Sequence, residues 1–173
     1  MGRAAGSRRP QVMTARCAYR VAQVRSAHRA AIREADQEEA LSHLDPALGE
    51  LFLRMAARDQ VHALRVLRRL GDAEPLLRQA ALLHDVGKIE TPMGTMGRSM
   101  VVLAGATGTT GLLTRVPGIG PRVQRYLDHP RIGAELLRHA GADGPLVQIV
   151  AEHESKRPSH PETAILQAID ERE

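Results

Sequence analysis

Cysteine and aromatic residues are nearly absent from this 173-residue sequence, which has one cysteine, one phenylalanine, two tyrosines and no tryptophan. Because Cys17 is alone, an internal disulfide is excluded, and we expect a reducing, intracellular compartment. Hydrophobic residues still make up 43% of the chain. A core built from them must consist mainly of Leu, Ala, Val and Ile, which suits close-packed helices.

Long apolar runs are also missing. The longest uncharged stretch, residues 99–114, is rich in Gly and Thr and is too short for a membrane span. Arg8 and Arg9 are followed by Pro10 and Gln11 rather than by the apolar segment of a secretion signal. We therefore expect a soluble, cytoplasmic protein.

Acidic residues are missing from residues 1–33, which hold eight arginines. The other 140 residues hold sixteen basic and twenty acidic side chains, so the pI of about 10.0 comes from this segment and not from the body. Arg25, Arg29 and Arg33 lie four residues apart and would line one stripe of a helix. We expect a basic arm over residues 1–45, partly disordered and partly helical. Its stripe is either a solvated face or a surface for an anionic partner, nucleic acid or lipid.

Beyond the arm, we find no alternation of period two, the pattern of half-buried strands. Apolar residues instead recur three and four positions apart, as in Leu48, Leu51, Phe52 and Met55. This spacing predicts an all-α fold, a compact helical bundle over residues 46–173 with an N-terminal helical extension.

One predicted helix leads directly into an ionisable pair. In PLLRQAALLHDVGKI, apolar residues cover much of the helix circumference, and His84 and Asp85 stand at its end. An isolated pair of this kind is more often structural. An imidazole and a carboxylate are nevertheless costly to bury without partners, and a divalent cation would satisfy both. Gly87 permits the chain to turn here, and Lys88 follows as a positive charge.

Three stretches together resemble the HD superfamily of metal-dependent phosphohydrolases, in its HDIG-like branch. They are HDVGK at 84–88, HPRIGAELL at 129–137 and VAEHES at 150–155. The resemblance spans about residues 46–173, and it includes an upstream helical histidine and a late aspartate.

The resemblance also implies which side chains bind metal. A first ion would be held by two imidazoles and two carboxylates, those of His62, His84, Asp85 and Asp170. A second ion would be held by His129, His153 and Glu152, with Asp85 as the bridge. One or two ions of Mn²⁺, Fe²⁺, Mg²⁺, Zn²⁺, Co²⁺ or Ni²⁺ are compatible with these donors.

The second set departs from the family pattern at one position. Two-metal members commonly carry His-His-Glu where this chain reads Glu152-His153-Glu154. An ungapped comparison puts Glu152 at the first histidine, and a carboxylate also binds hard or borderline divalent metals. We therefore expect a second site that is altered in affinity or in metal preference.

The function that the resemblance implies is hydrolysis of a phosphoester, in a nucleotide or related phosphorylated metabolite, by metal-activated water. Asp85 and Lys88 are the predicted catalytic residues, with Lys88 placed in sequence to bind a phosphate. Lys88 is equally explained as a surface lysine favoured by the dipole at a helix end. The alternative function is that of a non-catalytic sensor or scaffold, which keeps a metal or nucleotide bound.

A remote alternative is dinucleotide binding through the glycines of MVVLAGATGTTGLL, which are Gly105, Gly108 and Gly111. That site needs a strand before the glycines and an acidic residue about 20 positions later. Asp128 stands seventeen positions beyond Gly111, but the chain shows no series of alternating strands and helices. Otherwise we expect this segment to connect two helices, with a helix of its own through Val101–Ala104. It would form a lid or wall of the metal pocket, or a surface facing a partner or a membrane.

Overall fold

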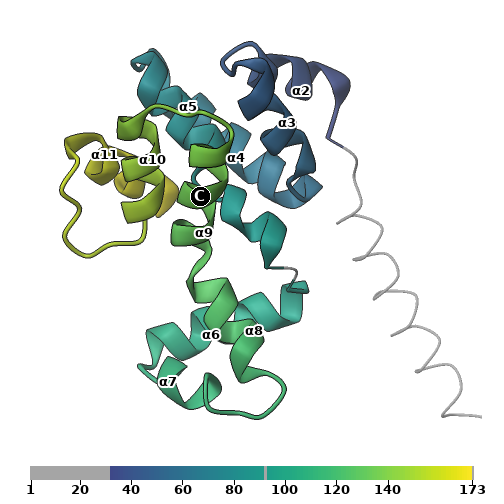
Figure 1. The fold of residues 1–173 in the computed structure, drawn as a ribbon, viewed down its shortest axis with the longest axis vertical. Helices are drawn as coiled ribbons and strands as arrows, with labels where there is room; N and C mark the ends of the chain where they lie inside the picture. Colours follow the sequence, from purple (N-terminus) through teal and green to yellow (C-terminus); the bar gives the residue numbers. More distant parts are fainter. Residues whose placement is uncertain (1–31, 92, 173) are drawn as a thin grey trace, which may run out of the picture. The chain divides into compact units, whose positions relative to one another are not determined.

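Helices alone make up the regular structure of residues 32–91 and 93–172, the part of the chain that the computed structural model describes (Figure 1). The all-α prediction is therefore confirmed. Of these helices, none combines the length with the apolar character that crossing a membrane requires. Residues 1–31 of the basic arm, with their predicted helix, lie outside the described residues.

The helices succeed one another along the chain with short connections. They are α2 (Glu34–Leu41), α3 (Pro46–Arg54), α4 (Ala57–Leu70), α5 (Pro75–Leu83), the 3₁₀ helix η1 (Val86–Glu90), α6 (Thr95–Ala106), α7 (Thr110–Leu113), α8 (Gly120–Leu127), α9 (His129–His139), α10 (Gly144–Glu152) and α11 (Pro161–Asp170). Residues 32–45, which the sequence assigned to the arm, form one compact unit with the residues after them, and α2 packs on α3.

Proline, aspartate and glycine set where the first of these helices begin and end. α3 begins with Pro46, and the Asp45 carboxylate accepts a hydrogen bond from the backbone N–H of Leu48 at 3.0 Å. This bond satisfies one of the donors that a helix start leaves unpaired. α4 ends at Gly71, whose φ of +62° lies in the region that favours glycine. The local sequence therefore accounts for these boundaries.

The main core is organised around α5, which packs against α4, α10 and α11. Ala80, Ala81, Leu82 and Leu83 are completely buried, because apolar residues cover most of the circumference of this helix. Burying one leucine side chain contributes about 1.5–3 kcal/mol. The residue that ends this well-buried helix is His84, so the core determines where that imidazole lies.

A glycine contact joins η1 to α9. A Cβ added at Gly87 would overlap the backbone carbonyl oxygen of His129 and would lie 2.6 Å from the backbone nitrogen of Gly133. A Cβ at Gly133 would in turn lie 3.1 Å from the nitrogen of Gly87. The two backbones can approach this closely only because neither residue has a side chain. The contact brings the start of α9 beside Asp85.

The segment that matched a dinucleotide motif is helical. Residues 100–104, which would have formed the strand, lie inside α6, and Gly111 lies inside α7. The dinucleotide alternative is therefore wrong, because residues 100–104 form a helix where the motif requires a strand. The predicted helix through Val101–Ala104 is confirmed as part of α6.

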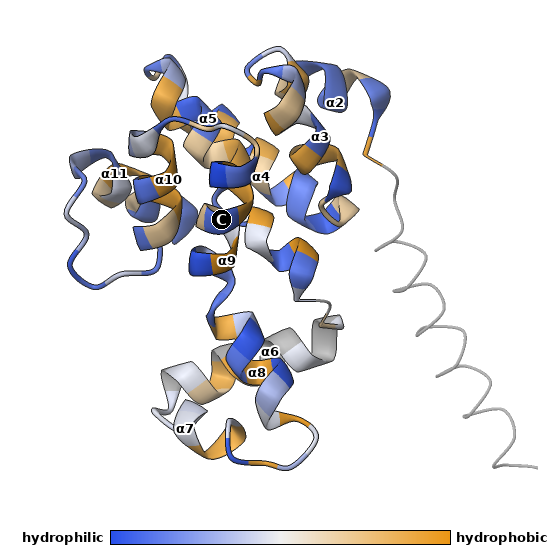
Figure 2. Ribbon diagram, in the orientation of Figure 1, coloured by the Kyte–Doolittle hydropathy of each residue, from blue (hydrophilic) through white to orange (hydrophobic). Residues whose placement is uncertain are grey.

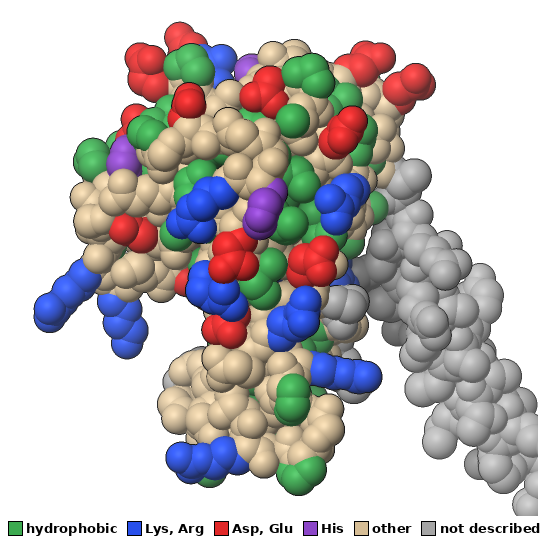
Figure 3. Space-filling model, in the orientation of Figure 1, with side chains coloured by type: hydrophobic (Ala, Val, Ile, Leu, Met, Phe, Trp, Pro, Cys, Tyr) green, Lys and Arg blue, Asp and Glu red, His purple; other side chains and the backbone are tan. Residues whose placement is uncertain are grey.

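Helices α6, α7 and α8 form a lobe that Figure 1 shows beyond the N-terminal end of α9, which follows α8 in the chain. A small cluster of Val101, Val123 and Tyr126 is buried within it. Several large apolar side chains of the lobe are exposed: Met100, Leu103, Leu112, Val116 and Ile119. Figure 2 shows hydrophobic segments at α7 and in the loop before α8, and Figure 3 shows apolar side chains at the surface of the same lobe.

Candidate metal centre

Three buried histidines share one local arrangement. His84 ends α5, His129 begins α9 and His153 ends α10, and at most 6% of each residue is exposed. Each ring places Nδ1 at hydrogen-bond distance from the backbone carbonyl three residues earlier. These carbonyls belong to Ala81, Tyr126 and Val150, at 3.0, 2.8 and 2.7 Å respectively. Because a carbonyl only accepts, Nδ1 carries the proton of the neutral ring and Nε2 keeps its lone pair.

The three Nε2 atoms face one carboxylate, that of Asp85. His129 Nε2 lies 3.3 Å and His153 Nε2 lies 3.8 Å from Asp85 Oδ1. His84 Nε2 lies 3.7 Å from Oδ2 of the same side chain. Lone pairs and a carboxylate repel one another at these distances. The arrangement therefore requires a cation among these groups, either a proton or a metal.

The environment of His84 Nε2 indicates whether a metal ion fits this site. This atom is buried and has no hydrogen-bond partner among the described residues. An unpaired buried polar atom costs about 1–3 kcal/mol, and a divalent cation bound to the lone pair would remove that cost. Imidazole nitrogens and carboxylate oxygens together suit Mn²⁺, Fe²⁺, Co²⁺, Ni²⁺ and Zn²⁺. The residues present therefore fit a divalent metal.

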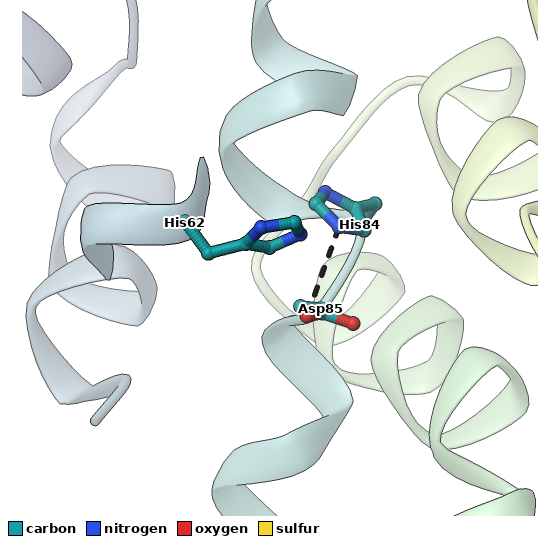
Figure 4. A group of neighbouring side chains, drawn as sticks. All are labelled: His62, His84 and Asp85. Atoms are coloured by element: carbon teal, nitrogen blue, oxygen red, sulfur yellow. Dashed lines mark ion pairs between the residues drawn. The ribbon is translucent and has the colours of Figure 1, made fainter. Parts of the chain in front are cut away.

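His62 of α4 and Asp170 of α11 complete a first group with His84 and Asp85. His62 Nε2 lies 2.7 Å from Asp170 Oδ1, and the same oxygen is 3.6 Å from His84 Nε2. Figure 4 shows His62 extending from its own helix toward His84 and Asp85. The side chains of His62 and Asp170 are 30% and 34% exposed, whereas His84 is 1% exposed. Solvent therefore reaches the centre on the side of His62 and Asp170.

A second group shares Asp85 with the first. The ligand atoms of His62, His84 and Asp85 lie within 4.8 Å of one another, and so do those of Asp85, His129 and His153. Six of the seven side chains predicted as ligands thus come together, although they come from distant parts of the chain: His62, His84, Asp85, His129, His153 and Asp170.

Burial and the neighbouring charges shift the pKa values of Asp85 and His84 in opposite directions. Burial would raise the pKa of Asp85, but the neighbouring cationic and imidazole groups outweigh it and hold that pKa well below its usual range. Burial would lower the pKa of His84, yet the carboxylates beside it raise it overall. Burial and the neighbouring His84 lower the pKa of His153 to about 3. Asp85 is therefore ionised and His153 neutral near pH 7, which are the forms that bind metal.

Lys88 pairs with Asp85 and is largely withdrawn from solvent. Its Nζ bonds to Asp85 Oδ2, and only 15% of its side chain is exposed. The ammonium also lies over the ring of Tyr126, 5.9 Å from the ring centroid. Burial would lower the pKa of Lys88, but Asp85 raises it overall, so the group stays charged. The alternative of a surface lysine at a helix end is wrong.

Glu152 is the predicted ligand that lies outside the centre. Its carboxylate accepts hydrogen bonds from the backbone N–H and hydroxyl of Ser159, at 2.7 and 2.6 Å, and from the backbone N–H of His160 at 3.3 Å. The expectation that Glu152 joins the second group is therefore corrected. The nearby carboxylate is that of Glu154, whose Oε1 is 3.7 Å from His129 Nε2. The sequence offers a glutamate on each side of His153. Sequence alone does not show which of the two lies near the second group.

A pocket of about 550 Å³ opens beside the two groups. Its walls include His153 and Asp170 from the groups themselves, together with Glu154 and Lys156. Lys156 supplies the positive charge among the lining residues, none of which comes from α6, α7 or α8. A pocket of about 590 Å³ along α8 and α9 contains none of the predicted ligands. Of these two pockets, the first is therefore the one that gives a small ligand access to the centre.

Comparison with protein families gave one finding that bears on this centre. The family model described as HD domain matches residues 60–173, a range that contains all the residues of both groups. The match does not distinguish the HDIG-like branch. Comparison with curated proteins and with solved structures gave no match.

Proposed function

The chain belongs to the HD domain family, and we propose that it hydrolyses a phosphoester of a nucleotide or related phosphorylated metabolite with the help of one or two divalent metal ions. The observation that carries this proposal is the convergence of three buried Nε2 lone pairs on the carboxylate of Asp85. Such a set of donors is costly without a cation and favourable with one.

Each part of the centre has a separate role in this proposal. A bound divalent ion lowers the pKa of a coordinated water toward neutrality and neutralises charge on phosphoryl oxygens. Asp85 stands between the two groups and offers one oxygen to each side. Lys88 compensates the charge of Asp85 and keeps it ionised. The backbone carbonyls behind the histidines fix the ring orientation, which holds each Nε2 toward the metal.

The substrate class follows from the pocket and from charge. A pocket of about 550 Å³ suits a small molecule rather than a polymer. Lys156 is the cation on its wall, and the carboxylates of Glu154, Asp170 and Glu171 also line it. Lys156 would therefore attract a phosphate group once divalent ions offset these carboxylates. We therefore propose a small phosphorylated substrate.

A non-catalytic sensor or scaffold is the second candidate. It is favoured by the departure from His-His-Glu, because the carboxylate of Glu152 is engaged by Ser159 and His160 and is not free to bind metal. A protein with one well-formed group could retain a metal or nucleotide without turnover.

Metal analysis and a substrate panel distinguish the two candidates. Metal-depleted protein is reloaded with each divalent ion, its metal content is measured, and phosphomonoesters and phosphodiesters are assayed. We expect turnover that Asp85→Asn abolishes and that His139→Ala, an exposed histidine on the same helix as His129, leaves unchanged. Bound metal without turnover on any substrate would favour the sensor. If neither His84→Ala nor Asp170→Ala lowered the metal content, the ligand assignment itself would be wrong.

A further inference from the structure

The geometry points to Glu154, and not Glu152, as the fourth ligand of a second metal ion held by Asp85, His129 and His153. This inference rests on the metal centre of the proposed function and names one of its ligands. It gives Glu154 the ligand role that the sequence had predicted for Glu152.

Two distances within the second group match the spacing of ligands around one ion, and a third is longer, since His153 Nε2 lies 3.8 Å from Asp85 Oδ1. Two ligands that each lie about 2.1 Å from an ion, at tetrahedral or octahedral angles, are about 3.0–3.4 Å apart. His129 Nε2 lies 3.1 Å from His153 Nε2 and 3.3 Å from Asp85 Oδ1. Since both imidazoles donate through Nδ1 to backbone carbonyls, the two Nε2 atoms face each other as lone pairs. A cation between them explains this close approach, and we propose that it is the second metal ion.

Glu154 lies beside the group of Asp85, His129 and His153 on the solvent side, with its contact at His129. Its Oε1 lies 3.7 Å from His129 Nε2, and its side chain is 54% exposed, whereas His129 is 1% exposed. A nitrogen and a carboxylate oxygen at this distance can both bind an ion placed between them. The pocket beside the group is lined by Glu154, Asp170 and Glu171, and of these carboxylates Glu154 is the one in contact with His129.

The turn that carries Glu154 is held in place by α11. Gln167 donates from Nε2 to the backbone carbonyls of His153 and Ser155, at 2.9 and 2.8 Å. These bonds fix the chain on both sides of Glu154. Glu152 precedes this turn as the last residue of α10 and directs its carboxylate to Ser159 and His160. Glu152 therefore has a structural role, and Glu154 has the ligand role.

With Glu154 included, the two groups become chemically alike. The first has two imidazoles and two carboxylates, from His62, His84, Asp85 and Asp170, and the second has the same donors, from His129, His153, Asp85 and Glu154. Three carboxylates would then face two divalent ions and leave one net positive charge. Such a centre would attract an anionic phosphoester.

The test is a Mn²⁺ titration of the metal-depleted, full-length protein, followed by calorimetry and by electron paramagnetic resonance. We expect two ions per chain, with the spin-coupled signal of a pair that shares the Asp85 carboxylate. Glu154→Gln should weaken the second ion at least about tenfold and remove the coupled signal, while the first ion binds as before. Glu152→Gln is the matched control and should keep both ions. Circular dichroism checks that both variants are folded.

Each other outcome is informative. If Glu154→Gln binds two ions as the unchanged protein does, or if Glu152→Gln loses the second ion instead, the assignment of Glu154 is overturned. If the unchanged protein binds a single ion, the assignment fails and the proposed hydrolase can still stand on the first group. If two ions bind with the expected dependence on Glu154 but no phosphoester is hydrolysed, the assignment holds and the proposed activity fails.

Discussion

Gly87 of η1 lies against the backbone carbonyl of His129 so closely that a single added carbon atom would overlap it. This contact joins the segment that follows Asp85 to the first turn of α9. It explains how a carboxylate and an imidazole forty-four positions apart in the sequence come to lie 3.3 Å apart.

We expect Gly87→Ala to push η1 away from α9, because the obstacle is backbone rather than a flexible side chain. Overpacking of this kind lowers the free energy of unfolding by about 1–3 kcal/mol, and the second group should lose metal affinity as His129 moves. Denaturant unfolding and metal content measure the two effects. Gly144→Ala is the control, since an added Cβ there meets nothing within 4 Å. Equal stability of Gly87→Ala and the unchanged protein would contradict this account of the contact.

Gln167 should prove important for the second group although it is not a predicted ligand. Its amide donates to the carbonyls of His153 and Ser155, and losing two such bonds costs about 1–3 kcal/mol. Gln167→Glu should be worse than Gln167→Ala near neutral pH, because a carboxylate would face those carbonyls. We expect both variants to weaken the second Mn²⁺ ion more than the first. A uniform loss of both ions would instead indicate that α11 as a whole had moved.

Stability at low pH should depend on Asp36. Hydrogen bonds from Arg33 and Arg68 lower the pKa of Asp36 to about 2, from an ordinary value of 3.8. A lowered carboxylate pKa stabilises the fold above the ordinary value, and this contribution is lost as the pH falls from 3.8 toward 2. The difference in Tm between the unchanged protein and Asp36→Asn should therefore be present near neutral pH and should disappear near pH 2.

Glu38→Gln, at an exposed position of the same helix, is the control for that experiment. It should change Tm little at any pH in the series. A gap between the unchanged protein and Asp36→Asn that persists at the acidic end would mean that the effect does not come from ionisation of Asp36.

The basic arm is proposed to bind an anionic partner, nucleic acid or lipid, and its removal tests this. A chain that begins at Ile32 lacks seven of the eight arginines of residues 1–33 but keeps Arg33, which pairs with Asp36. We expect it to lose salt-sensitive binding to RNA, DNA or anionic vesicles. Hydrolysis of a small substrate should be unchanged. Undiminished binding by the shortened chain would place the anionic partner elsewhere.

Much of the fold could be predicted because it depends on local patterns. The apolar spacing of residues 48–55 and of the helix before His84 predicted helices, since a stripe or circumference of apolar residues is what a packed helix needs. The cost of burying His84 and Asp85 without a cation is equally local, but the pair predicted a metal centre only together with the resemblance to the HD superfamily. The glycine motif at 105–111 supported only a remote alternative, because its spacing says nothing about whether a strand precedes it.

The packing of the helices determined which glutamate lies near His129 and whether Lys88 is buried. Both Glu152 and Glu154 stand beside His153 in the sequence, but α10 ends at Glu152 and Glu154 lies in the turn that follows. The position where α10 ends decides which carboxylate lies near His129. Ser159 donates a hydrogen bond to Glu152, and Gln167 donates to the backbone of the turn that carries Glu154. Lys88 is buried against Asp85 for a similar reason, because η1 packs on α9. Residue order predicts which groups are available, whereas distances between groups far apart in the chain are set by tertiary contacts.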